Sequence, residues 1–205
     1  MKWNKIAMAG FFAAMVLGLA GCGDSSGVVL LYDPVSVGST WIYNRSDNGI
    51  RTQTNVAGAN NQATREVNDS ATGKSVATIT ISNNAYYLSN LILYDTAGVY
   101  TATKTYSPSP GQLFLLAATA VGSHETQTVL VTTQPANTTA TVSLDMTVAG
   151  YENITVPAGT FANALKTQTV IGSTTISSWF ALNVGMIRQD VNNVTSVVLA
   201  SYSIK

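Results

Sequence analysis

The sequence predicts an all-β fold, a large curved antiparallel sheet or incomplete barrel with little helix. Short segments in which apolar and polar residues alternate follow one another from Tyr32 to the end of the chain. Turn-forming Gly, Asn, Asp and Pro residues separate these segments. Only 10% of the residues are charged, and Thr, Val, Ser and Asn are abundant. Around a dozen strands at this spacing would form a large curved sheet, a sandwich or a barrel.

The alternation is clearest in residues 40–45, 75–82 and 141–148. In each segment every second residue is apolar, which is the pattern of a strand with one face buried and the other in water. The residues predicted on the buried faces are Trp41 and Tyr43; Ala77, Ile79 and Ile81; and Val142, Leu144, Met146 and Val148.

Turn residues divide the remaining chain. The predicted turns lie at 47–49, 69–73, 83–84, 95–98 and 192–193. The strongest break is Ser107–Gly111, because its two prolines cannot lie within a central strand. The best helical candidate after the N-terminal segment is 161–165, and the apolar stretch 112–120 is ambiguous between strand and helix.

The two sides of the proline-rich break echo each other. The sequence around Gly38 resembles that around Gly122, and the sequence around Gly98 resembles that around Gly185. The paired glycines are 60 residues apart in the first half and 63 in the second. This spacing suggests two related halves, 32–106 and 113–205, within one domain. Coincidence is the alternative, because Gly and Val are common in this chain.

The first residues are typical of a bacterial secretory signal. Lys2 and Lys5 precede an uncharged, mostly apolar run that ends in Leu19-Ala20-Gly21-Cys22, which contains the only cysteine. The domain boundaries expected from this pattern are a signal peptide at 1–21, a tether at 22–31 and a single all-β domain at 32–205. An uncleaved membrane anchor and an ordinary secretory signal with a free thiol are the alternatives.

Leu19-Ala20-Gly21-Cys22 resembles the lipobox of bacterial lipoproteins. The resemblance implies that Cys22 is acylated and becomes the mature N-terminus, so the acyl chains would hold the protein to a membrane. Gly23 follows the cysteine, and by the sorting rule of such lipoproteins this favours the periplasmic face of the outer membrane in a Gram-negative host, although Asp24 weakens the inference slightly.

Two further stretches resemble a largely uncharacterised group of all-β envelope lipoproteins. The opening 32–43 is similar to theirs, with a proline, a Val-Gly turn and a Trp-x-Tyr strand. The Val156-Pro157-Ala158-Gly159-Thr160-Phe161 segment is similar to their V-P-A-G-T-F hairpin, in which we expect Phe161 to fold back as a core anchor. Trp179-Phe180 and the glycine turn 184–187 resemble the part that follows. The group brings no catalytic residues, so the resemblance implies fold and not mechanism.

The residues offer little for catalysis or metal binding. His124 is the only histidine, and adjacent Glu125 would point to the opposite face of a strand, so we expect a surface histidine. Gly23–Gly27 matches the G-x-S-x-G motif of hydrolases, but it follows a signal peptide instead of a strand. We therefore expect no enzyme activity, no catalytic residues, no metal and no cofactor. The absence of a Lys/Arg cluster argues against nucleic acid as a partner.

A hairpin rich in aromatic and aliphatic residues suggests one binding surface. Its candidate apolar ligand residues are Tyr86, Leu88, Leu91, Leu93 and Tyr100. The favoured expectation is a lipid-anchored, non-enzymatic structural or interaction module. The alternative is a carrier for a lipid or acyl chain that this hairpin would line, and a hydrolase comes third. A carrier would need an open apolar cavity of several hundred Å³.

Overall fold

The computed structural model describes residues 32–59 and 61–205, which contain thirteen β-strands. Within these residues no helix is long and apolar enough to cross a membrane. The strands are β1 (Thr40–Arg45), β2 (Ile50–Ala59), β3 (Gln62–Asp69), β4 (Gly73–Ser82), β5 (Ala85–Tyr94), β6 (Tyr100–Ser107), β7 (Gln112–Leu115), β8 (His124–Gln134), β9 (Thr138–Val156), β10 (Gly159–Ile171), β11 (Thr174–Ala181), β12 (Gly185–Val191) and β13 (Val194–Ser203).

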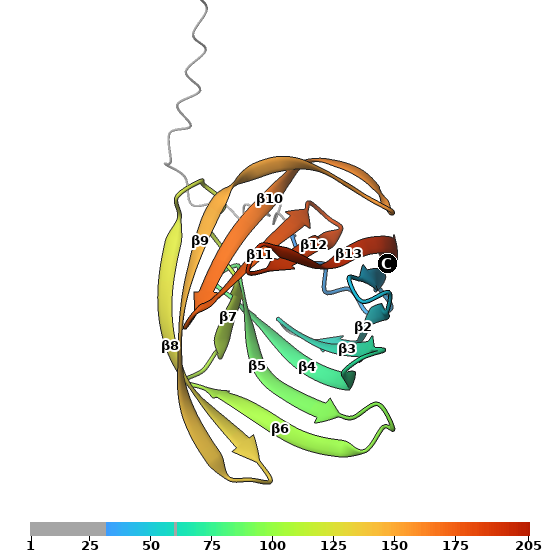
Figure 1. Cartoon of the computed structure of the whole chain (residues 1–205). Helices are drawn as coiled ribbons and strands as arrows, with labels where there is room; N and C mark the ends of the chain where they lie inside the picture. The colour runs from blue at the N-terminus through green and yellow to red at the C-terminus, as the bar shows by residue number, and fades with distance from the viewer. Residues whose placement is uncertain (1–31, 60) are drawn as a thin grey trace, which may run out of the picture.

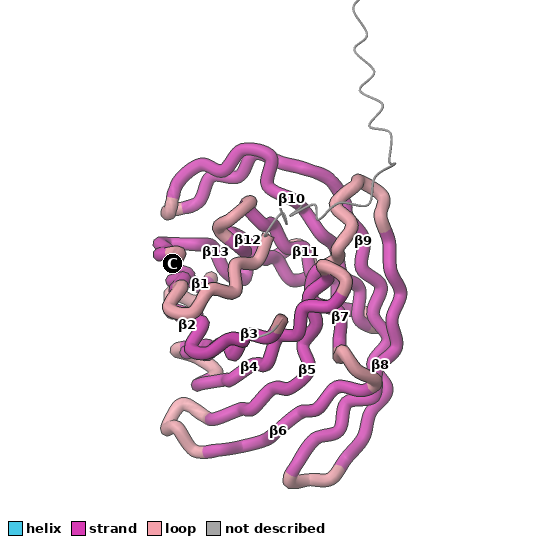
Figure 2. Tube along the Cα trace, turned by 180° about the vertical axis from the view of Figure 1, so that it is seen from behind, coloured by secondary structure: helices cyan, strands magenta, loops and turns pink. Residues whose placement is uncertain are grey.

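Twelve of the strands form a closed antiparallel barrel in chain order (Figure 1). Neighbours from β1 to β6 pair with one another, β6 pairs with β8, and β13 returns to pair with β1. Figure 2 shows these strands following one another around the ring through short connections. The predicted all-β class is confirmed, and the barrel is closed where the sequence also allowed an incomplete one. Closure satisfies the backbone groups that a sheet edge would leave unpaired.

β7 is the strand outside this ring, and it continues the course of β6 along β5. β6 pairs with residues 90–94 of β5, whereas β7 pairs with residues 86–88. The proline-rich segment 107–111 separates the two, as expected, because proline has no N–H to donate to a neighbouring strand. Figures 1 and 2 show β7 on the inner side of the curve formed by β8 and β9. β7 therefore fills part of the barrel interior.

A side chain replaces the missing strand pairing between β7 and β8. The Gln127 amide nitrogen donates to the Gly111 carbonyl at 2.8 Å, and its oxygen accepts from the Leu113 backbone N–H at 2.7 Å. The amide thus mimics a backbone peptide group and satisfies an edge that would otherwise be unpaired.

The expected alternation is confirmed in three strands. β1 spans the predicted segment 40–45, and β4 and β9 contain the other two. The alternating residues that are fully or nearly fully buried are Trp41 and Tyr43, Ala77 and Ile79, and Leu144, Met146 and Val148. Val142 and Ile81 are only partly buried.

The helical candidate at 161–165 was wrong, because these residues form a bulge in β10. The register shifts between Phe161 and Ala164. Asn163 adopts a φ of 53°, and its backbone N–H donates to the Asn153 side-chain oxygen at 3.0 Å. Phe161 packs against the core and beside Tyr202 as expected of an anchor, although it is only partly buried, whereas Leu165 after the bulge is fully buried. Of the ambiguous stretch 112–120, only β7 is regular structure.

The first of the two sequence echoes coincides with matching turns. Gly38 before β1 has a φ of 85°, and its N–H donates to Asn55 of β2 at 2.8 Å. Gly122 before β8 has a φ of 86°, and its N–H donates to Val148 of β9 at 2.9 Å. The second echo does not match, because Gly98 follows β5, five strands after Gly38, whereas Gly185 begins β12, four strands after Gly122. The two related halves stay a prediction.

Candidate functional site in the barrel interior

The N-terminal segment 32–34 closes one end of the barrel. Asp33 is buried and pairs with buried Arg65 of β3 at 3.0 Å. The Pro34 carbonyl accepts from the Asn55 side chain at 2.9 Å and from Arg65 at 3.3 Å. The Arg65 guanidinium also lies 4.9 Å from the ring centroid of Trp41. These contacts hold the segment inside the ring.

Burial shifts the pKa values of the acidic groups at this closed end. Desolvation raises the pKa of Asp33 above its ordinary value, although Arg65 opposes this shift, and Asp33 Oδ2 has no hydrogen-bond partner. Burial, with a contribution from the charge of Asp33, raises the pKa of Tyr86 to about 12. The Tyr43 hydroxyl donates to the Met186 carbonyl at 3.0 Å, and burial raises its pKa as well. The acidic groups at the closed end are therefore buried away from solvent.

Away from this end, β2 to β5 present rows of paired residues to the interior. The register places one row above the next from the rim inward. The rows are Arg51, Asp69 and Gly73 at the rim; then Gln53, Val67, Ser75 and Leu93; then Asn55, Arg65, Ala77 and Leu91; and then Ala63, Ile79 and Leu88. The rim row is mostly charged, and the rows further in are mostly apolar apart from Gln53, Ser75 and the Asn55–Arg65 pair that binds the N-terminal segment.

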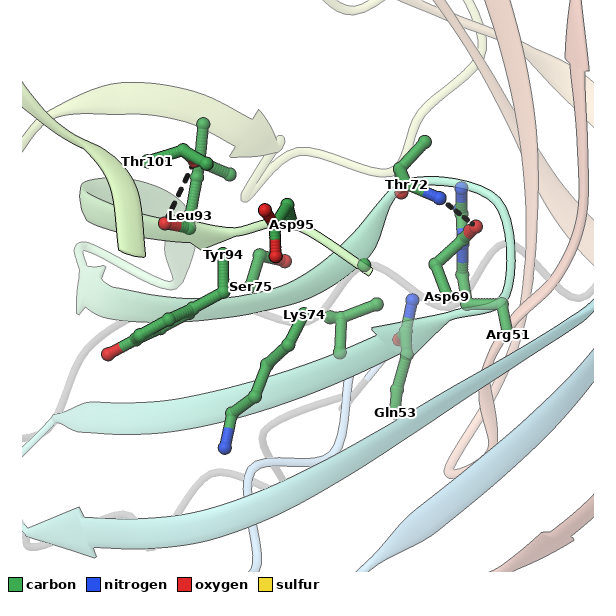
Figure 3. A pocket seen from close by; sticks show the side chains of 12 residues that line it. Arg51, Gln53, Asp69, Thr72, Lys74, Ser75, Leu93, Tyr94, Asp95 and Thr101 are labelled. Atoms are coloured by element: carbon green, nitrogen blue, oxygen red, sulfur yellow. Dashed lines mark hydrogen bonds and ion pairs between the residues drawn. The ribbon is translucent and has the colours of Figure 1, made fainter. Parts of the chain in front are cut away.

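Two adjoining cavities occupy this part of the barrel. The outer cavity, shown in Figure 3, has a volume of about 520 Å³. The inner cavity has a volume of about 200 Å³, and its apolar lining includes Leu88, Leu91, Phe114 and Met186. Arg51, Gln53, Val67 and Ser75 line both cavities, so the inner one continues the outer one. Ligand pockets commonly have volumes of about 300–1,000 Å³, and the outer cavity lies in that range.

The outer cavity lies at the barrel end opposite the N-terminal segment. It is lined by Thr72, from the β3–β4 turn, and by Asp95, which begins the β5–β6 turn. Because the strands are antiparallel, these turns lie at the far end from the start of β1. The interior is thus closed at the end where the described chain enters and accessible from the other.

Asp69 organises the charged rim. Its Oδ2 accepts from Arg45 at 2.6 Å and from Arg51 at 2.8 Å, and its Oδ1 accepts from the backbone N–H groups of Ala71 and Thr72. Burial would raise the pKa of Asp69, but the hydrogen bonds from Arg51, the Ala71 amide and Arg45 lower it overall. The carboxylate is therefore ionised, and its ion pair with Arg51 holds that side chain in place. Figure 3 shows Asp69 beside Arg51 and bonded to Thr72.

The structure separates the five candidate ligand residues. Leu88 and Leu91 line the inner cavity, and Leu93 lines the outer one. Tyr86 is buried in the core at the closed end. Tyr100 is 45% exposed and lines neither cavity. It packs edge-on against Tyr94.

Sequence reasoning missed the polar and distant parts of the site. Three polar residues were missed because they lie on strands where the polar side chains point inward: Arg51, Gln53 and Arg65. From the sequence alone, a polar face of a strand is assigned to solvent. Phe114 and Met186 come from β7 and β12, far along the chain. One signal in the sequence points toward this site. The pattern of Gly73–Leu93 predicts a hairpin, and that hairpin forms part of the cavity wall.

A second cluster, on the outer face of the barrel, is already fully paired. Trp179 lies between Lys166 and Arg188, each with its charge 4.9 Å from the ring centroid. Glu152 accepts from the Trp179 indole N–H at 2.8 Å and from Lys166 at 2.9 Å, and these bonds lower its pKa. Arg188 is paired with Asp190 at 2.7 Å. These contacts pack Trp179 against the outside of the barrel wall and give both carboxylates of the cluster a basic partner within it.

His124 lies on the surface, as expected. It begins β8 and pairs with Asp145 at 2.7 Å, and both side chains are 48% exposed. Among the described residues no group of three or more His, Cys, Asp or Glu side chains is placed to hold a metal ion. The expected signal peptide, Cys22 and the tether lie outside the described residues.

Comparison with known proteins gives one family match. No curated protein and no solved structure matches the chain. The model of an uncharacterised family described as DUF3108-like matches residues 115–203, from the last residue of β7 through β13. The second part of the barrel is therefore similar to DUF3108-like proteins.

Proposed function

We propose that this protein is a lipid-anchored envelope protein whose barrel interior binds an elongated apolar or amphipathic molecule. The observation that carries the proposal is an apolar inner cavity of about 200 Å³ that opens into an outer cavity of about 520 Å³ with a mixed polar and apolar lining. A module with a purely structural role has no need of such a space, and tight packing is the usual state of protein interiors. The carrier alternative from the sequence is therefore favoured over the structural module.

The placement of the open end supports this proposal. If Cys22 is acylated, the tether 22–31 leads from the membrane to the closed end of the barrel. The open end would then lie at the opposite end of the barrel from the attachment point, where a ligand or a donor protein could reach it. A largely hydrophobic lining suits a molecule that water disfavours, such as an acyl chain.

Photolabelling tests the proposal without detergent, which would compete for the cavity. The full chain is reconstituted in lipid nanodiscs and exposed to a dodecanol that carries a diazirine within its chain. We expect labelled peptides from residues 88–93 and 113–115. Ala77→Phe, which inserts a ring into the inner cavity, should reduce this labelling at least fivefold.

Thr78→Phe is the matched control, because residue 78 is next to Ala77 on β4 and its side chain points to the opposite face. It should leave interior labelling unchanged. Labelling confined to outward-facing residues, or equal interior labelling in both variants, would refute the proposed function.

A further inference from the structure

Arg51 lines both cavities and has hydrogen-bonding capacity that the other interior arginines lack. Its Nε donates to Asp69 at 2.8 Å, while its two terminal nitrogens make no hydrogen bond or ion pair with the described residues. Its side chain is only 22% exposed. Arg45 uses all three nitrogens on Asp47 and Asp69. Arg65 uses all three on Asp33, Asn55 and Pro34.

The environment of Arg51 fits one kind of head group. A guanidinium with two free terminal nitrogens presents donors that match the oxygens of a carboxylate or phosphate. On its inner side the cavity is lined mainly by apolar side chains, among them Leu91 and Phe114, and its other arginine, Arg65, is already engaged within the protein. A head group held at Arg51 would therefore leave its attached chain in apolar surroundings.

Two carboxylates also line the outer cavity, and both are engaged within the protein. Asp69 is held by two arginines and two backbone amides. Asp95 Oδ1 accepts from the backbone N–H groups of Ala97 and Val99 in its own turn. Their negative charge disfavours an anion beside them, so the head group belongs on the inner side of Arg51, which also lines the inner cavity.

We infer that the barrel interior selects single-chain amphiphiles with an anionic head, a carboxylate or a phosphate, and that the terminal nitrogens of Arg51 determine this specificity. The inference rests on the proposed function. The inference predicts a difference between ligands, because a neutral chain of the same length would make only the apolar contacts and would not bind Arg51.

Paired photolabels separate the inference from the proposed function. A dodecanoate and a dodecanol, each with the diazirine at the same carbon, are applied to the full chain in nanodiscs over a range of concentrations. In Arg51→Gln the concentration of dodecanoate that gives half-maximal interior labelling should rise about tenfold, consistent with the loss of a charge-assisted hydrogen bond. The value for dodecanol should stay the same.

Lys74→Gln is the matched control, because Lys74 also lines the outer cavity but pairs with Glu66 at 2.6 Å. It should change neither probe. Arg51→Lys keeps the charge with a different donor geometry, and should weaken dodecanoate labelling less than glutamine does. Competition by unlabelled dodecanoate and dodecyl phosphate then shows which anionic head is preferred.

The outcomes are distinguishable. If neither probe labels the interior, the proposed function fails, and this inference fails with it. If both probes label the interior alike and Arg51→Gln affects neither, or affects both equally, the interior binds apolar chains and the role of Arg51 is refuted.

Discussion

In β9 to β13 large apolar side chains fill the interior, whereas in β2 to β5 the inward positions mix apolar side chains with small, polar and charged ones. Leu144, Leu165 and Phe180 are at most 2% exposed and belong to one continuous core. On the other side, Arg51, Gln53 and Ser75 line open space. The same antiparallel alternation thus builds a filled interior in one part of the ring and cavities in the other, and the difference lies in side-chain volume and polarity.

The family match falls on the filled part. Residues 115–203 include most of that core, while most residues that line the two cavities lie between 51 and 114. Met186 and Gln189 are the exceptions, since they line the inner cavity from β12. What the match describes is therefore mainly the packed wall. The features on which the proposed ligand depends belong to the part of the chain that the match does not cover.

The largest expected effect comes from making the same substitution in both parts. Leu144→Ala should lower the free energy of unfolding by about 3 kcal/mol, because it leaves a cavity in a packed core. Leu91→Ala should lower it by about 1 kcal/mol, since Leu91 already borders a cavity and loses mainly its own transfer free energy. Urea unfolding of the full chain, followed by tryptophan fluorescence, gives both values. Equal losses would contradict the distinction between the two parts.

The alternation in single strands could be predicted from the sequence, and the closed barrel could not be distinguished from a curved sheet. Trp41, Tyr43 and Leu144 were placed on buried faces because each lies in a short segment with period-two polarity. Closure depends on pairing between β1 and β13, at opposite ends of the chain, and local pattern contains no information on that register. The bulge at Asn163 was missed because a Phe-Ala-Asn-Ala-Leu run is compatible with a helix.

The candidate site was predicted only in part, for a related reason. Leu88 and Leu91 were found because apolar residues on a hairpin suggest a binding surface. Arg51 and Gln53 were not, because sequence reasoning assigns a polar face to solvent, and here that face lines the barrel. Only the closed ring makes those positions interior.

Removing the charge of Asp69 at the rim should have a smaller effect on stability, and this effect should depend on pH. Asp69→Asn should lower the free energy of unfolding by about 2 kcal/mol at pH 7, since it weakens hydrogen bonds between charged groups. The pKa of Asp69 is lower in the folded protein than its ordinary value of 3.8. Its stabilising effect is therefore complete above pH 3.8 and is lost as the pH falls through the folded value. The difference in melting temperature between wild type and variant should shrink accordingly.

Asp47→Asn is the control for this charge effect. Asp47 pairs with the same Arg45 at 2.8 Å, but its side chain is 48% exposed, so solvent screens the interaction. Arg45 and the Gly49 amide also lower the pKa of Asp47, but at this exposure the variant should lose much less stability than Asp69→Asn does at pH 7. A gap for Asp69→Asn that widens below pH 3.8 would mean that the folded protein raises the pKa of this carboxyl.

The smallest effect concerns the two halves of the sequence, 32–106 and 113–205, and whether their first turns are related. Gly38 and Gly122 have nearly equal positive φ values, at which an alanine is strained by about 1 kcal/mol. A Cβ at Gly38 would meet only Lys205 Cγ at 3.4 Å, and one at Gly122 would meet nothing within 4 Å. Gly38→Ala and Gly122→Ala should therefore lower the free energy of unfolding by the same amount, measured in urea. A loss at one position that exceeds the other by more than 1 kcal/mol would argue that the two turns only look alike, and that the halves diverge in their turns as they do in their interiors.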